Sequence, residues 1–124
     1  EITIVKNLAV IVTSPPYNNL SITALDYIET ALKADIKLVG VFFYQDGVMH
    51  ANQQIQIPSD EFQCIKQWRL LYQTYQLPLH LCVTAAEKRG LSDEKPNNID
   101  SIFTVSGLGE LVELVNKADR VVQL

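Results

Sequence analysis

Cys82 is the residue of this chain whose type and position could do the most specific chemistry. It lies in the segment LPLHLCVTAAEKRG, between a short apolar stretch and residues typical of a helix. In parallel α/β sheets, ligands gather at the carboxyl ends of strands, and the positive end of a following helix stabilises a thiolate. Free cysteine is also among the most buried residue types and is often a small packing residue. The local pattern leaves both interpretations open and slightly favours packing.

The other cysteine, Cys64, is predicted to be a small core residue. It falls within a predicted helix on the same apolar stripe as Trp68. Two cysteines far apart in the sequence do not form a disulfide framework or a C-x-x-C motif. Together with His50 and His80 they match no usual zinc-ligand spacing, so no metal site is expected. No cofactor is implied by the sequence.

Three charged or basic residues lie close to Cys82 in sequence. His80 precedes it by two positions and would share its face of an alternating strand, which is weak support for a Cys–His pair. Lys88 and Arg89 could add positive potential, although they follow Cys82 by about two helical turns. These residues therefore do not settle whether Cys82 is reactive.

Two further segments could border the same cleft. Residues 44–46 (YQD) follow the second predicted strand, and an ordinary turn at Asp46-Gly47 explains them better than a binding role. The segment SGLGEL places Gly107 and Gly109 at a helix start, but it lacks the lysine of a P-loop and does not match G-x-G-x-x-G. Close backbone packing is the expected reason for these two glycines.

The elements that must position these residues alternate between strand and helix. In chain order we expect a buried strand at 8–12, a loop at 14–19, a helix over 22–34, a strand over 36–48 broken at 46–47, a helix over 60–77, a strand over 79–83, a short helix over 85–91, a polar loop over 92–100, a helix over 106–118 and a strand over 119–124. The alternation predicts an α/β sandwich with a mainly parallel sheet.

Two serines are the expected caps of the first two long helices. Ser21 would cap the helix over 22–34, and Ser59 would cap the next one, with Asp60 and Glu61 in its first turn. The second of these helices would carry a broad apolar face. Its members would be Phe62, Cys64, Ile65, Trp68, Leu71, Tyr72 and Tyr75.

Length and composition limit the classes of protein. The 124 residues fit a single domain over 1–124, and 48% hydrophobic residues suffice for a core without disulfides. The formal net charge of −4 argues against direct nucleic-acid binding. No apolar run reaches membrane-spanning length and no signal peptide is evident, so a reducing cytoplasm is the expected compartment.

Several segments together resemble the TusD-like group of the DsrE family of sulfurtransferases. They are VFFYQDGV, SDEF, LCVTAAEKRG, FTVSGLGEL and DRVVQ, in this order and at the spacing of the family, and the resemblance covers essentially the whole chain. The resemblance implies a three-layer α/β sandwich with about five strands, one more than the four found above. One departure is the loop SPPYNN, where TusD-like proteins usually have a glycine-containing loop.

The resemblance also implies an activity. TusD-like proteins carry sulfane sulfur as a persulfide on the cysteine of a CVxAAxxRG segment, which is Cys82 here. It implies a TusA-like sulfur donor, a TusE-like acceptor, TusB-like and TusC-like partner subunits in a hetero-oligomer, and 2-thiouridine in tRNA as the destination. Alone, the chain could form a homo-oligomer.

Three alternatives to this function stay open at the level of sequence. Related DsrE proteins serve sulfur oxidation rather than tRNA modification. The chain could also be a non-catalytic scaffold of the same fold, with Cys82 buried and inert. A small-molecule or nucleotide-binding domain that uses the glycine loop would differ from both, because its binding would survive Cys82→Ser.

Overall fold

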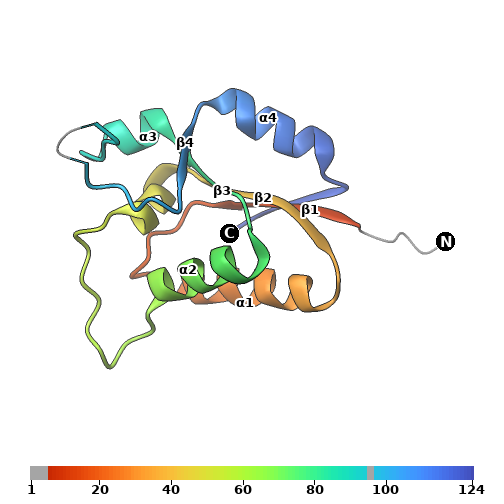
Figure 1. Ribbon diagram of the computed structural model, residues 1–124, viewed down its shortest axis with the longest axis horizontal. Helices are drawn as coiled ribbons and strands as arrows, with labels where there is room; N and C mark the ends of the chain where they lie inside the picture. Colours follow the sequence, from red (N-terminus) through yellow and green to blue (C-terminus); the bar gives the residue numbers. More distant parts are fainter. Residues whose placement is uncertain (1–5, 95–96) are drawn as a thin grey trace.

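The structure, a computed structural model, describes residues 6–94 and 97–124 and has one parallel five-stranded sheet at its centre (Figure 1). The strand order is β4-β3-β2-β1-β5, and every pair of neighbours runs parallel. The elements are β1 Asn7–Val12, α1 Asn19–Lys33, β2 Lys37–Phe43, the 3-10 helix η1 Gln45–Ala51, α2 Cys64–Tyr75, β3 Leu79–Cys82, α3 Val83–Glu87, β4 Thr104–Ser106, α4 Leu108–Lys117 and β5 Arg120–Gln123.

Helices cover both faces of this sheet. Figure 1 shows α1 and α2 on one face and α3 and α4 on the other. This arrangement confirms the predicted three-layer α/β sandwich, with a sheet that is entirely rather than mainly parallel. Among the described residues, no helix is both long and apolar enough to cross a membrane.

The neighbouring strands β1 and β2 form the middle of the hydrophobic core. Val10 and Val12 of β1 and Val41, Phe42 and Phe43 of β2 are fully buried. Continuous apolar runs of this kind are typical of parallel strands that are covered on both faces. The prediction of buried strands in these two segments is therefore confirmed.

The prediction that Ser21 caps the first long helix is wrong. The helix begins at Asn19, and the side chain of Asn18 accepts the N–H of Leu20 at 2.9 Å. Ser21 lies in the first turn, buried, with its hydroxyl directed at the carbonyl oxygens of Pro16 and Asn18. Both residue types are good caps, so the packing of the loop at 14–18 against the helix decides which one is used.

The predicted start of the second long helix is also wrong. The helix begins at Cys64 rather than after Ser59, because the side-chain amide of Gln63 donates to the carbonyl oxygens of Ile57 and Pro58 and holds the preceding segment in a turn. Cys64, Trp68 and Leu71 form its buried face, as predicted. The other expected members of that face differ: Phe62, Tyr72 and Tyr75 are exposed, and Ile65 is half-buried.

The second strand ends earlier than expected, and a 3-10 helix follows it. The strand stops at Phe43, and residues 45–51 form η1, in which His50 is fully buried. Gly47 makes this turn possible, because a Cβ atom at that position would lie only 2.0 Å from the carbonyl oxygen of Val12. The close approach ties η1 to the end of β1.

The fifth strand, absent from the pattern analysis and implied by the family resemblance, is β4. It has only three residues, Thr104–Ser106, and forms the edge of the sheet beside β3. Thr104 is exposed, and Val105 and Ser106 are half-buried. Such a short, half-exposed strand carries no apolar run or sustained alternation that a sequence pattern could reveal.

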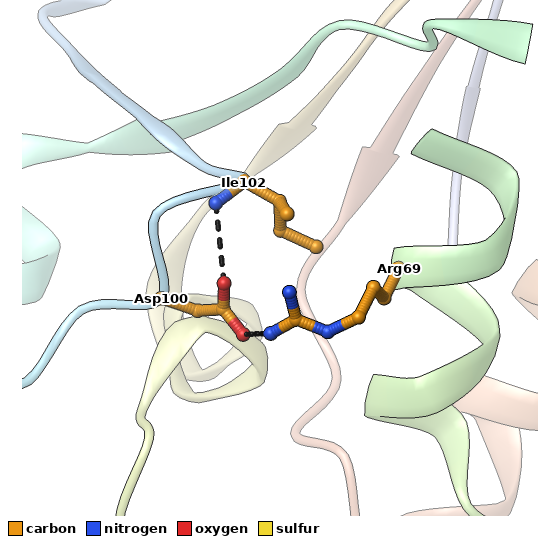
Figure 2. Close-up of polar contacts among 3 residues, drawn as sticks. All are labelled: Arg69, Asp100 and Ile102. Carbon is orange, nitrogen blue, oxygen red and sulfur yellow. Dashed lines mark hydrogen bonds and ion pairs between the residues drawn. The ribbon is translucent and has the colours of Figure 1, made fainter. Parts of the chain in front are cut away.

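A buried carboxylate fixes the segment that leads into β4 (Figure 2). Asp100 forms an ion pair with Arg69 of α2, and its other oxygen accepts the N–H of Ile102 at 3.1 Å. The backbone N–H of Asp100 also donates to the carbonyl oxygen of Ala51, at the end of η1, at 2.8 Å. The position of β4 beside β3 is thus tied to both α2 and η1.

Candidate active site

Cys82 is the last residue of β3 and the residue that immediately precedes α3. The carboxyl ends of β2, β3 and β4 lead into η1, α3 and α4 (Figure 1), so Cys82 lies between the carboxyl ends of β2 and β4. The predicted position at a strand-to-helix junction is therefore correct. Cys82 is only 1% exposed, so its thiol is buried.

Polar side chains lie next to Cys82 on the same face of the sheet. Cys82 pairs with Ser106 across the β3–β4 register, and His80 shares its face by strand alternation. His80 Nδ1 lies 3.1 Å from Ser106 Oγ, and His80 Nε2 lies 3.5 Å from a carboxylate oxygen of Glu110 on α4. His80, Ser106 and Glu110 are all partly exposed. The structure thus groups His80 with Ser106 and Glu110, which the sequence did not single out, and places Ser106 opposite Cys82 in the sheet register.

Burial sets the protonation state of His80 at neutral pH. It is the main cause that lowers the pKa of His80 below its usual value; the carboxylate of Glu110 opposes this effect and the ammonium group of Lys117 adds to it. The imidazole is therefore neutral at pH 7, with one nitrogen free to accept a proton.

Arg89 does not direct its charge at Cys82. Its Nε donates to a carboxylate oxygen of Asp46 on η1 at 2.9 Å, and an Nη donates to the carbonyl oxygen of Ala85 at 3.0 Å. The ion pair links the end of α3 to η1, and its carboxylate is largely exposed. Residues 44–46 therefore lie in the turn that was favoured, and Asp46 links this turn to the end of α3 through Arg89.

The second cysteine belongs to a buried cluster on the opposite face of the sheet. Cys64 is fully buried, and its thiol donates to the carbonyl oxygen of Pro16 at 3.3 Å. His50 lies beside it, with Nδ1 at 3.9 Å from the sulfur, and accepts the indole N–H of Trp68 at 3.0 Å. The other nitrogen of His50 faces the carbonyl oxygen of Ser14 at 2.9 Å. These contacts connect the loop after β1, η1 and α2.

The pKa values of this cluster are shifted towards the neutral forms. Burial raises the pKa of the Cys64 thiol to about 11 and lowers the pKa of His50 to about 4. A thiol of this kind is almost entirely protonated at neutral pH and is a poor nucleophile. The prediction that Cys64 is a core residue is confirmed, with the addition that it is hydrogen-bonded.

Comparison with known proteins decides the family. The model of the DsrE/DsrF-like family matches residues 6–124. The chain belongs to the DsrE/DsrF-like family. A sulfurtransferase TusD of Pectobacterium carotovorum subsp. carotovorum (strain PC1) is 38% identical, over 91% of this chain and 95% of that protein. A sulfurtransferase TusD of Klebsiella pneumoniae subsp. pneumoniae is 37% identical, over 93% and 97%. These relatives confirm the predicted class of protein, a sulfurtransferase.

Two further comparisons agree with this family. A sulfurtransferase TusD homolog of Pasteurella multocida is 44% identical over 71% of this chain and 75% of that protein. The crystal structure of the ychN protein from E. coli has a TM-score of 0.75, with 20% identity over 96% of this chain and 99% of that one. The second likeness shows that the two proteins share the fold.

The glycines after β4 have a different role in this DsrE/DsrF-like chain from the one expected. Nothing lies within 4 Å of a Cβ atom built at Gly107 or at Gly109, so close backbone packing does not explain either residue. Gly107 instead occupies the position before α4, in an extended conformation. The prediction of packing glycines was wrong because the β4–α4 turn faces open space.

Ser106 and Glu110 are the site residues that sequence reasoning missed. Ser106 lies in the strand that the pattern did not reveal, and Glu110 lies 30 positions after His80, the residue of β3 that it contacts. The motif SGLGEL contains both residues, so a prediction that β4 pairs with β3 would have placed them beside Cys82. Within 6–94 and 97–124, no group of three or more His, Cys, Asp or Glu side chains is placed to hold a metal ion.

Proposed function

We propose that the chain carries sulfane sulfur as a persulfide on Cys82 and passes it from a donor protein to an acceptor protein. The observation that carries the proposal is the position of Cys82 at the end of β3 and directly before α3, in the segment that resembles the carrier motif of TusD-like proteins. Such a junction is the carboxyl end of a strand, where chemistry gathers in parallel α/β sheets.

The chemistry needs one thiol and a partner at each step. The Cys82 thiolate attacks the outer sulfur of the donor persulfide, and the acceptor thiolate later attacks the outer sulfur of the Cys82 persulfide. Both cysteines of the chain are free, and Cys64 lies on the other face of the sheet in a different hydrogen-bond cluster. A resolving thiol beside Cys82 would collapse the persulfide into a disulfide, so the separation favours a persulfide that survives until the acceptor arrives.

The partners and the destination follow from the same family resemblance. We propose a TusA-like donor, a TusE-like acceptor and assembly with TusB-like and TusC-like subunits, with 2-thiouridine in tRNA as the final product. The net charge of −4 agrees with a subunit that handles sulfur on proteins and does not itself bind nucleic acid. A cytoplasmic location belongs to the same proposal.

A second candidate function is favoured by one observation. Cys82 is only 1% exposed, which fits a non-catalytic scaffold subunit whose thiol packs in the core. Under the carrier proposal, docking of a partner has to open the surface above Cys82 before sulfur can move. The neighbouring α3 has five residues and β4 has three, so the elements on either side of the thiol are short.

A sulfur-transfer assay separates these two candidates. The chain is incubated with a persulfidated TusA-like protein, freed of the donor, and then mixed with a reduced TusE-like protein whose sulfur content is followed by mass spectrometry. We expect transfer by the unmodified chain and by Cys64→Ser, and none by Cys82→Ser. Transfer that survives Cys82→Ser would contradict the carrier role, and absence of transfer by all three would support the scaffold.

A further inference from the structure

Helix α4 leaves most of its apolar side chains uncovered. Of its five aliphatic residues only Leu114 is buried, and Leu111 is partly buried against the core. The other three, Leu108, Val112 and Val115, are 43% to 58% exposed. Residues spaced by three and four positions lie along one side of a helix. These three residues therefore form a continuous aliphatic stripe, called here the α4 stripe.

The contacts of α4 show which way the α4 stripe faces. Glu110 and Lys117 act on His80 of β3, and the side chain of Leu114 lies directly over Gly40 of β2. Successive residues of a helix are about 100° apart around its axis. The α4 stripe is therefore on the flank opposite Glu110 and Lys117. In the strand order β4-β3-β2-β1-β5, that flank is turned towards β1 and β5.

Strand β5 ends the sheet on this side and has a free backbone edge. Leu124 directs both of its backbone groups to β1: its N–H donates to the carbonyl oxygen of Ile11, and its carbonyl oxygen accepts the N–H of Thr13, each at 2.8 Å. Backbone groups alternate in direction along a strand of a parallel pair. The N–H and C=O groups of Val121 and Gln123 therefore point away from β1. Within the described part of the chain, no strand pairs with this edge.

The other face of β5 is also incompletely covered. A groove of about 540 Å³ lies between α1 and β5, with the buried residues Leu8 and Ala31 in its lining. Asp26 of α1 and Arg120 of β5 line the same groove, and both are exposed. Among the residues that the structure describes, neither charged side chain forms an ion pair. The groove thus offers one negative and one positive group to a partner.

We propose that this edge of the molecule binds a second copy of the chain in a dimer with two-fold symmetry. The β5 strands of the two copies pair antiparallel through Val121 and Gln123, so the two five-stranded sheets become one. The α4 stripes of the two copies pack together on one face of the joined sheet, and the grooves beside α1 meet on the other. The inference goes beyond the proposed carrier function, which uses the opposite side of the sheet.

The charges of the groove select a second copy as the occupant. A two-fold interface places a surface against itself, so Asp26 of one copy is matched by Arg120 of the partner subunit. A partner segment with charges of one sign would match only one of these two residues. The edge is also unguarded, because the β5 sequence RVVQ holds neither the lysine nor the proline that commonly protects an edge strand.

The dimer leaves the candidate active site accessible to other proteins. Cys82 ends β3, and β2 and β1 separate β3 from β5. Dimerisation and sulfur transfer therefore use different sides of the molecule, and each can be tested while the other fails.

The test is the mass of the full chain in solution, measured by sedimentation equilibrium between about 1 and about 500 μM. Val112→Glu places a charge in the α4 stripe, and Val121→Lys places one at the β5 edge. Leu70→Glu is the matched control, because Leu70 is an exposed aliphatic residue of α2, away from β5. Urea unfolding of each variant shows that it is folded.

We expect the unmodified chain and Leu70→Glu to have twice the monomer mass. In Val112→Glu and Val121→Lys the dissociation constant of the dimer should rise at least about a hundredfold, because each change occurs twice in a symmetric interface. A monomer at every concentration, a ring of three copies, or a dimer that both variants leave intact would overturn the proposal. So would an unmodified chain that stays monomeric and uses this edge only for a different subunit.

Amide hydrogen exchange, resolved by NMR, tests the pairing of β5 itself. The N–H groups of Val121 and Gln123 should exchange at least about tenfold more slowly in the dimer than in monomeric Val112→Glu. The N–H of Val122, which faces β1, should be protected in both. Equal exchange of Val121 and Gln123 in the two states would overturn the joined sheet. Failure of sulfur uptake would contradict the carrier function and would leave the mass and exchange results unchanged.

Discussion

The two cysteines of this chain are buried to almost the same extent, yet their surroundings differ. Cys64 is 0% exposed and Cys82 is 1% exposed. Cys64 donates its proton to a carbonyl oxygen within a cluster of buried partners, and burial raises its pKa to about 11. Cys82 ends a strand, precedes a helix and pairs with a partly exposed serine. The two buried thiols therefore differ in their neighbours rather than in their depth.

The two histidines follow the same division. His50 is fully buried, and both of its nitrogens are engaged, by the indole N–H of Trp68 and the carbonyl oxygen of Ser14. His80 is partly exposed and contacts a hydroxyl and a carboxylate. We conclude that the face covered by α1 and α2 holds a structural cluster, and that the face covered by α3 and α4 holds the candidate chemistry.

The largest expected difference between the two regions is in the rate of alkylation. At about pH 8, folded Cys64 should react at least about a hundredfold more slowly than Cys64 of the same chain in urea, because a pKa of about 11 leaves very little thiolate. Peptide mass spectrometry after timed iodoacetamide labelling measures both rates. Equal rates for Cys64 in the folded and unfolded chain would show that its cluster opens freely and would remove the contrast.

The next largest effect is a loss of stability towards acidic pH through His50. Its pKa is about 4 in the folded chain against 6.5 for the free side chain, so the unfolded chain binds a proton first as the pH falls. Neutral His50 therefore contributes its full stabilisation above about pH 6.5. Between about pH 6.5 and pH 4 the free energy of unfolding should fall by at most about 3 kcal/mol. Urea unfolding at several pH values measures it.

His50→Gln is the variant that tests this assignment, because glutamine does not titrate. This variant should be less stable than the unmodified chain at pH 7. Its free energy of unfolding should fall much less between pH 6.5 and pH 4. His80→Gln is the control and should retain most of that decline. An unchanged slope in His50→Gln would assign the acid sensitivity to other groups.

A smaller effect is expected when Trp68 loses its hydrogen bond. Trp68→Phe keeps an aromatic ring against Phe43 but leaves Nδ1 of buried His50 without its donor. Such an unsatisfied group costs about 1–3 kcal/mol of the free energy of unfolding. The urea midpoint should fall, whereas sulfur uptake by Cys82 should keep its rate. A loss of sulfur uptake at full stability would contradict the division between the two faces.

The smallest effect is expected at the ion pair between η1 and α3. Asp46→Asn removes the partner of Arg89, and because the carboxylate is 64% exposed the free energy of unfolding should change by less than about 1 kcal/mol. Unfolding at low and high salt measures the change, which should shrink with salt. A much larger loss would mean that this pair, rather than backbone packing, holds α3 after Cys82.

Much of the fold was predictable because apolar runs and strand–helix alternation leave few arrangements. The buried strands around Val10 and Val41 and the junction at Cys82 follow from such patterns. Helix starts were less predictable, because Asn18 and Ser21 are both good caps and only the folded loop decides between them. The three-residue strand β4 lies below the length at which a pattern appears.

The candidate site was predictable only in part. Local spacing placed Cys82 at a strand-to-helix junction with His80 on the same face, and the family resemblance rather than the pattern singled out Cys82 as the sulfur carrier. Ser106 and Glu110 depend on the pairing of β4 with β3 and on the packing of α4, which are contacts between distant segments. Gly107 and Gly109 were misinterpreted for the same reason, because the space around them is set by the whole fold.

The measurement that tests the central claim most directly is the location of transferred sulfur in the unmodified chain. After incubation with a persulfidated donor protein and alkylation, the Cys64 and Cys82 peptides are compared by mass spectrometry, with Cys82→Ser treated in parallel. The account predicts one added sulfur atom on the Cys82 peptide, none on the Cys64 peptide, and no uptake by Cys82→Ser. Sulfur on Cys64, or uptake that persists in Cys82→Ser, would contradict it.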